Sequence, residues 1–234
     1  MKIKKYLLNN FFTRIAFKKM LPYMPRETIR SYLGFEALSP IEQFASKGYN
    51  DLLFSDLKLD SEDSALVLGG YLGYSISKLR DLYNCHVVAI EPIPEFAKTL
   101  REVFRLDEKV EVLEFAVSSS NGNLDLGLEG ESTGSNSNSG SSLKVKSRDI
   151  SELLAEFEVF PRVIEMNIEG GEYECLDRLI QTGVISRVEV LLVQFHRYGL
   201  ENELGKAQIR MNLEKTHTCI FEFPWVWERW DIKS

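Results

Sequence analysis

The sequence predicts an α/β fold: a doubly wound, mostly parallel sheet that carries an antiparallel hairpin at its C-terminal end. Two patterns lead to this prediction. Short apolar runs alternate with helix-like stretches, and runs that are apolar on both faces are typical of strands covered by helices on both sides. The last two extended segments leave no room for a crossover helix, so we expect them to pair antiparallel. The length, 234 residues with 44% hydrophobic residues, suits one globular domain.

The expected elements can be placed along the chain in order. Strands are predicted at residues 64–68, 86–90, 110–117, 162–168 and 188–195. Helices are predicted at 73–83, from after Glu91-Pro92 through about residue 104, and at about 171–181. The C-terminal hairpin is predicted at 218–223 and 226–233. Trp225, Trp227 and Trp230 fall in that hairpin, where core packing is a better interpretation than stacking on a sugar ring.

A second hairpin is expected between the third and fourth strands. Leucines alternate with polar residues over 124–128, and Leu143 and Val145 alternate in the same way, as in two paired strands. The segment between them, 129–142, has almost no apolar side chain. It therefore gains little by burial, and we expect a flexible surface loop there.

Residues 1–40 form a separate basic segment ahead of the main domain, which we place at 41–234. Lys18 and Lys19 interrupt the apolar run that a signal peptide or a membrane-spanning helix would need. Two interpretations remain for an amphipathic helix here: it packs on the domain, which we favour, or it contacts an anionic membrane surface. Its apolar residues recur at near-helical spacing: Ile3, Leu7, Phe11, Ile15 and Phe17.

Charge and cysteine content bear on the partners and the compartment. The first 30 residues carry eight basic side chains and one acidic side chain, a net charge of +7, which leaves −14 on the rest of a chain whose total is −7. An acidic body repels phosphates, so we expect no nucleic-acid partner. Cys85, Cys175 and Cys219 have no metal-ligand spacing and predict reduced thiols in a cytoplasmic protein.

The best candidates for ligand binding follow the first two strands, because doubly wound sheets bind ligands at the carboxyl ends of their strands. A glycine turn, Gly69-Gly70-Tyr71-Leu72-Gly73, follows the first strand. Glu91 ends the second strand, where a carboxylate can accept the two ribose hydroxyls of a nucleoside cofactor, although it could also be a solvated acid at a helix start. The turn lacks the G-x-G-x-x-G spacing of dinucleotide sites, which argues against NAD.

A dense polar cluster, EMNIEGGEYE, follows the fourth strand, and here the chain resembles a known family. The segments LVLGGYLGYS, AIEPIPE, MNIEGGEYECL and VQFH resemble those of FkbM methyltransferases in order and spacing. The ending THTCIFEFPWVWERWDIK resembles the tail of some bacterial members. The resemblance covers about Leu66 to Lys233, and IEGGEYE is its most specific part.

The resemblance implies a class I, Rossmann-like methyltransferase fold and S-adenosyl-L-methionine (SAM) as the cofactor. It also implies transfer of a methyl group to an oxygen, as on a hydroxyl of a glycan or a small metabolite. By position, Asn167 and Glu169 would face the methyl-transfer site. In the glycine turn, Gly69, Gly70 and Gly73 would line the methionine part of the cofactor, and Tyr71 would also bind the cofactor. Glu91 would hold the ribose, and Ala116 and Val117, at the end of the third strand, would lie beside the adenine.

Two departures from the family pattern keep other functions open. Many members carry Asp where Val67 and Asn167 stand, so one polar anchor and one proton acceptor are missing. A catalytically silent methyltransferase-like binding or scaffold protein is the main alternative. An NAD(P)-dependent oxidoreductase is a weaker alternative, because the glycine spacing does not support it.

Methyl transfer to a hydroxyl also needs a proton acceptor. His196 is the first candidate, since it ends the fifth strand and histidine titrates near neutral pH, although a purely structural histidine is an equal interpretation. Glu169 and Glu172 are the next candidates. These three residues have no metal-binding spacing, so we expect no metal. The sequence identifies neither the acceptor nor the oligomeric state.

Overall fold

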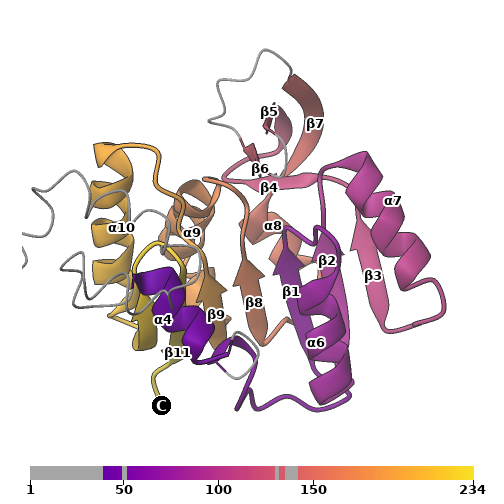
Figure 1. The fold of residues 1–234 in the computed structure, drawn as a ribbon, viewed down its shortest axis with the longest axis horizontal. Helices are drawn as coiled ribbons and strands as arrows, with labels where there is room; N and C mark the ends of the chain where they lie inside the picture. Colours follow the sequence, from indigo (N-terminus) through magenta and orange to yellow (C-terminus); the bar gives the residue numbers. More distant parts are fainter. Residues whose placement is uncertain (1–38, 49–51, 130–131, 135–141) are drawn as a thin grey trace, which may run out of the picture. The chain divides into compact units, whose positions relative to one another are not determined.

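The computed structural model describes residues 39–48, 52–129, 132–134 and 142–234, and these form the predicted α/β fold (Figure 1). The large sheet has seven strands in the order β10-β11-β9-β8-β1-β2-β3. Five neighbouring strands, β9-β8-β1-β2-β3, are parallel, and β11 pairs antiparallel with β9 and β10, as expected for the C-terminal hairpin. The strands are β1 (Ser64–Leu68), β2 (His86–Ile90), β3 (Val110–Leu113), β8 (Val163–Met166), β9 (Val190–Val193), β10 (His217–Phe223) and β11 (Trp227–Ile232).

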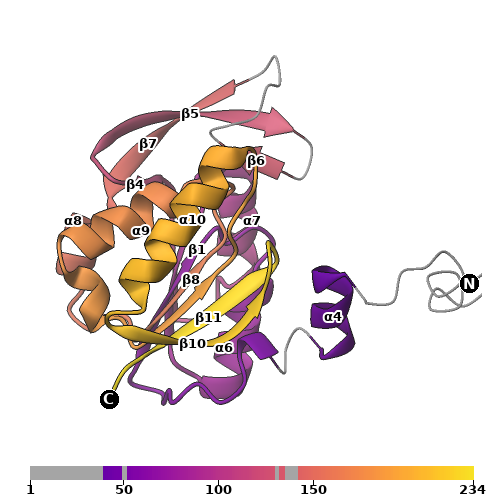
Figure 2. The same cartoon turned by 90° about the vertical axis from the view of Figure 1, so that its left-hand side faces the viewer.

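Helices cover both faces of this sheet (Figure 2). Alternate residues of β1 explain the two layers. Leu66 and Leu68 pack in one core with α8, α9 and α10, whereas Ala65 and Val67 pack in a second core with α6 and α7. The helices are α4 (Pro40–Ser46), α6 (Tyr74–Tyr83), α7 (Pro94–Val103), α8 (Ile150–Ala155), α9 (Glu172–Gln181) and α10 (Leu200–Leu213), with a 3₁₀ turn η2 at Val184–Arg187.

The prediction of one strand at 110–117 was wrong. The segment breaks at Glu114 and Phe115 into β3 of the large sheet and β4 (Ala116–Ser118) of a second sheet. After the Leu113 carbonyl accepts the N–H of Glu91, the chain leaves β2 and its next residues pair with β7. Both pieces are largely apolar, so the sequence pattern hid the break.

The second sheet has the order β4-β7-β5-β6 and lies beyond the carboxyl ends of β1 and β8 (Figure 1). It contains the predicted hairpin: β5 (Gly122–Glu129) pairs antiparallel with β7 (Ser142–Asp149), so that Leu124 faces Val145. A short strand, β6 (Ser132–Gly134), pairs with β5 inside the segment predicted to be a loop. The rest of that predicted loop, 130–131 and 135–141, lies outside the described residues.

The other predictions on the body of the chain have mixed outcomes. Trp230 is fully buried and Trp227 nearly so, which confirms core packing for both. The helices α8 and α10 were not predicted from the sequence. Cys85, Cys175 and Cys219 are free thiols.

Residues 1–38 of the basic segment predicted at 1–40 lie outside the described residues, and with them the predicted amphipathic helix and its membrane contact. The chain divides into two units, Met1–Gln43 and Phe44–Ser234. Within the described part of the chain, no helix is long and apolar enough to span a bilayer.

Candidate functional site

A cavity of about 370 Å³ lies at the carboxyl ends of the parallel strands. Its walls come from the ends of β1, β2 and β8, from β4 and from β5 of the small sheet. The large sheet reverses its order between β1 and β8, which is the point where doubly wound folds bind ligands. The volume lies in the range of small-molecule sites. Seven of the predicted site residues line this cavity: Gly69, Tyr71, Glu91, Ala116, Val117, Asn167 and Glu169.

The glycine turn places its backbone against the end of β8. Gly69 has a φ of +88°, and a Cβ there would lie 2.1 Å from the Asn167 carbonyl oxygen, so only glycine fits. Gly70 and Gly73 have a different role from the one predicted. They do not line the cavity, and a Cβ at either would meet side chains of the α7 segment, chiefly Leu100 and Phe104. These two glycines let α7 approach the turn closely.

Glu91 is a buried carboxylate in the middle of the cavity wall, 4% exposed. Its Oε2 accepts the N–H of Tyr71 and its Oε1 accepts the N–H of Ile93, each at 2.9 Å. Burial raises the pKa of this carboxyl, and the two N–H groups partly offset that rise. Each carboxylate oxygen can accept a further hydrogen bond, so these two acceptors suit a ligand that brings hydroxyl groups.

Asn167 supplies an unpaired acceptor at the β8 end of the cavity. Its Oδ1 is buried without a hydrogen-bond partner among the described residues, although the residue lines the cavity. A buried unpaired acceptor costs about 1–3 kcal/mol, so a donor such as an ammonium group would relieve this cost on binding. This position therefore fits a ligand with a positively charged nitrogen.

The loop after β8 is wrapped around one buried carboxylate. Glu172 is fully buried, and its oxygens accept the N–H groups of Ile168 and Gly170, both at 2.9 Å. The wrapping requires left-handed backbone at Glu169 (φ +50°) and Gly170 (φ +101°). Such a conformation is unfavourable for a residue with a side chain, and it turns Glu169 toward the cavity. Glu172 thus fixes the loop and has no free access to an acceptor.

His196 lies behind Glu169 and does not line the cavity. Its Nδ1 is 2.8 Å from Glu172 Oε1 and its Nε2 is 3.4 Å from Glu169 Oε1. Burial favours the neutral ring, but hydrogen bonds to these two carboxylates outweigh burial and raise the pKa of His196 to about 10. The ring is therefore an imidazolium at neutral pH, with both nitrogens donating.

Tyr198 lies beside Glu169 but does not itself line the cavity. Its hydroxyl donates to Glu169 Oε2 at 3.3 Å, and its ring stacks on His196 with centroids 6.4 Å apart. Burial, together with the negative charge of Glu169, raises the pKa of Tyr198, so its hydroxyl remains a donor at neutral pH. Within the described residues, no group of three His, Cys, Asp or Glu side chains has an arrangement that would hold a metal ion.

The opposite end of the cavity is apolar, and sequence reasoning missed most of it. Ile93 and Phe96 contribute from the β2–α7 segment, and Leu124 and Leu126 from β5. The Phe96 ring meets the Tyr71 ring edge-on at 4.8 Å. Alternation over 124–128 predicted a hairpin, but no sequence signal showed that its inner face would lie over the strand ends.

The fold and the cavity define a class of protein: a Rossmann-like domain of the methyltransferase type, with its ligand site at the switch point of the sheet. A family comparison makes this assignment specific. The methyltransferase FkbM domain matches residues 69–219, more than half of the chain, so the chain belongs to the FkbM methyltransferase domain family. A search of curated proteins found no significant match.

Solved structures are similar to this chain at low sequence identity. One, described as a "putative rRNA-methylase" from Clostridium thermocellum, is 9% identical with a TM-score of 0.52, over 85% of this chain and 98% of that chain. A fibrillarin from Aeropyrum pernix with natively bound SAM is 12% identical with a TM-score of 0.48, over 82% of this chain and 74% of that chain. An rRNA methylase from Streptococcus thermophilus is 13% identical with a TM-score of 0.48, over 84% of this chain and 98% of that chain.

The exclusion of nucleic acid as a partner was wrong. A structure described as an rRNA methylase has this fold, so an acidic body does not rule out an RNA acceptor. The physical reason is that net charge is a sum over the whole body. The excess of acids is counted over all of residues 31–234, so it does not fix the sign of the charge near the cavity, where an acceptor would enter.

Proposed function

We propose that this protein is a SAM-dependent O-methyltransferase whose cofactor lies in the cavity at the ends of β1, β2 and β8. The observation that carries the proposal is that one cavity contains two buried hydrogen-bond acceptors, each able to accept a further hydrogen bond. Asn167 Oδ1 would accept from the ammonium group of the methionine part, and Glu91 would accept from the ribose hydroxyls. Membership of the FkbM family supports the same cofactor.

The cofactor, when bound, supplies a methyl group already activated on a sulfonium. The protein must then orient an acceptor hydroxyl and take its proton while the new O–C bond forms. Glu169 fits this role, since its carboxylate lines the cavity at the polar end. His196 cannot take the proton at neutral pH while it is an imidazolium, so we assign it as a positioning residue that holds Glu169 from behind.

The acceptor class in this proposal is a hydroxyl on a glycan or a small metabolite, as the family resemblance implies. The Glu169 carboxylate accepts hydrogen bonds from hydroxyl groups, and the exposed ring of Tyr198 beside it offers an aromatic face to a sugar ring. An RNA acceptor is the other outcome of the test below.

The test is transfer of a labelled methyl group from SAM to a panel of hydroxyl acceptors: oligosaccharides, small hydroxylated metabolites and RNA. We expect base-stable, ether-linked label on a glycan or metabolite. Glu169→Gln should bind S-adenosylhomocysteine normally and transfer roughly 10² to 10⁴ times more slowly. His196→Gln should keep cofactor affinity and lower kcat, because Glu169 loses the neighbour that holds it in position.

Three results would contradict the proposal. Label on RNA would replace the acceptor class, and label on nitrogen or carbon would remove O-methylation. Cofactor binding without transfer to any acceptor would favour the catalytically silent binding protein, for which Val67 and Asn167 are the sequence signals.

A further inference from the structure

The β5–β7 hairpin contacts the cavity from outside the large sheet. Two leucines of β5, Leu124 and Leu126, line the cavity together with Ile93 and Phe96. Leu126 is 7% exposed and packs in a small core with Ile93, Ala116 and Val145. The hairpin therefore belongs to the cavity wall as much as the strand ends do, and the described part of it forms an apolar surface.

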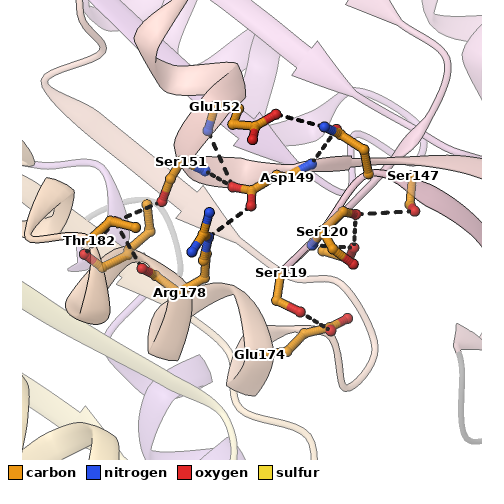
Figure 3. Close-up of polar contacts among 12 residues, drawn as sticks. Ser119, Ser120, Ser147, Asp149, Ser151, Glu152, Glu174, Arg178 and Thr182 are labelled. Carbon is orange, nitrogen blue, oxygen red and sulfur yellow. Dashed lines mark hydrogen bonds and ion pairs between the residues drawn. The ribbon is translucent and has the colours of Figure 1, made fainter.

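The base of this hairpin is fixed to the helical layer by a polar network (Figure 3). Asp149, at the end of β7, is 3% exposed; it accepts the N–H groups of Ser151 and Glu152 and the Nε–H of Arg178 from α9. Asn121 accepts the Asp149 N–H at 2.9 Å. A wall fixed in this way is preorganised, so ligand contacts on it need little ordering.

The order of polar groups along the cavity indicates what this wall contacts. Asn167 marks the β8 end and Glu91 the β2 position, with the apolar wall beyond Glu91 toward the small sheet. This step rests on the proposed function: if the amino-acid part lies at Asn167 and the ribose at Glu91, the purine base must continue in the same direction. The flat apolar base then meets Ile93, Ala116 and the two leucines.

We propose that Leu124 and Leu126 form the outer wall of the nucleobase site, so that the β5–β7 hairpin is a cofactor-binding element and not a lid over the acceptor. The hairpin would then set cofactor affinity by burying the base. The acceptor would enter at the other end of the cavity, beside Glu169 and Tyr198.

The chain offers a matched control for this proposal. Leu143 lies on β7 opposite Leu126, is half-buried like Leu124, and packs against the same small core, but it does not line the cavity. Leu124→Ala and Leu143→Ala therefore remove the same side chain from the same face of the hairpin. We expect both variants to lose similar thermal stability, which controls for damage to the fold.

The experiment is calorimetric titration of both variants of the full chain with S-adenosylhomocysteine and with adenosine, which lacks the amino-acid part. Leu124→Ala should raise the dissociation constant of both ligands about tenfold, and Leu143→Ala less than about twofold. An unchanged constant in Leu124→Ala, or an equal loss in Leu143→Ala, would overturn the proposal. Failure of the unmodified chain to bind S-adenosylhomocysteine would instead overturn the proposed function.

Discussion

At its β8 end the cavity is bounded by charges and hydrogen bonds, whereas at its β2–β5 end it is bounded by apolar side chains. The first end depends on a loop in left-handed backbone that encloses Glu172, supported by His196. The second depends on a hairpin packed over Ile93 and Phe96. The polar end positions reacting groups, and the apolar end supplies buried area. The two ends should therefore fail in different ways when they are altered.

The largest expected effect is at the polar end. Glu172→Ala removes the acceptor of two loop N–H groups and leaves the His196 imidazolium with one fewer carboxylate. Removing one partner of a buried ion pair costs about 3–5 kcal/mol, so we expect a loss of that size in the free energy of unfolding, measured by denaturant titration. Glu174→Ala, an exposed acid one position beyond Tyr173, is the control and should change stability by less than about 0.5 kcal/mol. Equal losses in the two variants would refute the role given to Glu172.

The second prediction concerns Glu165, a buried acid that lies at neither end of the cavity. Glu165 on β8 faces α6, where its Oε1 accepts the Ser75 hydroxyl at 2.8 Å; burial raises its pKa from 4.5 to about 7, and the Ser75 hydrogen bond partly offsets that rise. Between these pH values the folded chain binds more protons than the unfolded chain, so this group makes stability fall as pH rises from about 4.5 to about 7. Above pH 7 the ionised Glu165 carboxylate lowers the free energy of unfolding by its full amount, about 3 kcal/mol.

Glu165→Gln removes that titration. The variant should unfold at higher denaturant concentration than the original chain at pH 8, and the gain should shrink toward pH 5. Parallel stability–pH curves for the two proteins would show that Glu165 is already ionised in the folded chain at neutral pH.

The smallest expected effect distinguishes the two ends of the cavity by comparing two ligands, S-adenosylhomocysteine and adenosine. Asn167→Ala removes the acceptor for the amino-acid part, so affinity for S-adenosylhomocysteine should fall by roughly 10-fold to 100-fold, as for one charge-assisted hydrogen bond. Affinity for adenosine should not change, because adenosine does not reach this end. If Asn167→Ala weakens both ligands equally, the two ends are not independent.

The sequence predicted the polar end far better than the apolar end, for a physical reason. Glu169, Gly170 and Glu172 are neighbours in the chain, so one local motif contains both the strained loop and the carboxylate that holds it. Glu91 and Gly69 were found because strand ends in this fold meet at one edge. Both inferences needed only local spacing and the fold class.

The apolar end depends on contacts between distant parts of the chain. Alternation predicted β5 and β7, but the contact of Leu124 with the cavity depends on how the hairpin lies over the strand ends, and at the base of the hairpin Asp149 bonds to Arg178, 29 residues further along the chain. The same limit explains His196. Its position after the fifth predicted strand was expected, and it lies three residues beyond the end of β9, whereas its protonation depends on two carboxylates that follow β8.

Calorimetric titration of the original chain and of Glu91→Ala with S-adenosylhomocysteine is the most direct test of a cofactor site in this cavity. The original chain should bind at one site per chain. Glu91→Ala should bind more weakly by about 2–4 kcal/mol, the contribution of one or two hydrogen bonds to a charged acceptor. Equal affinity in both proteins, or no binding by the original chain, would contradict a nucleoside cofactor held at Glu91.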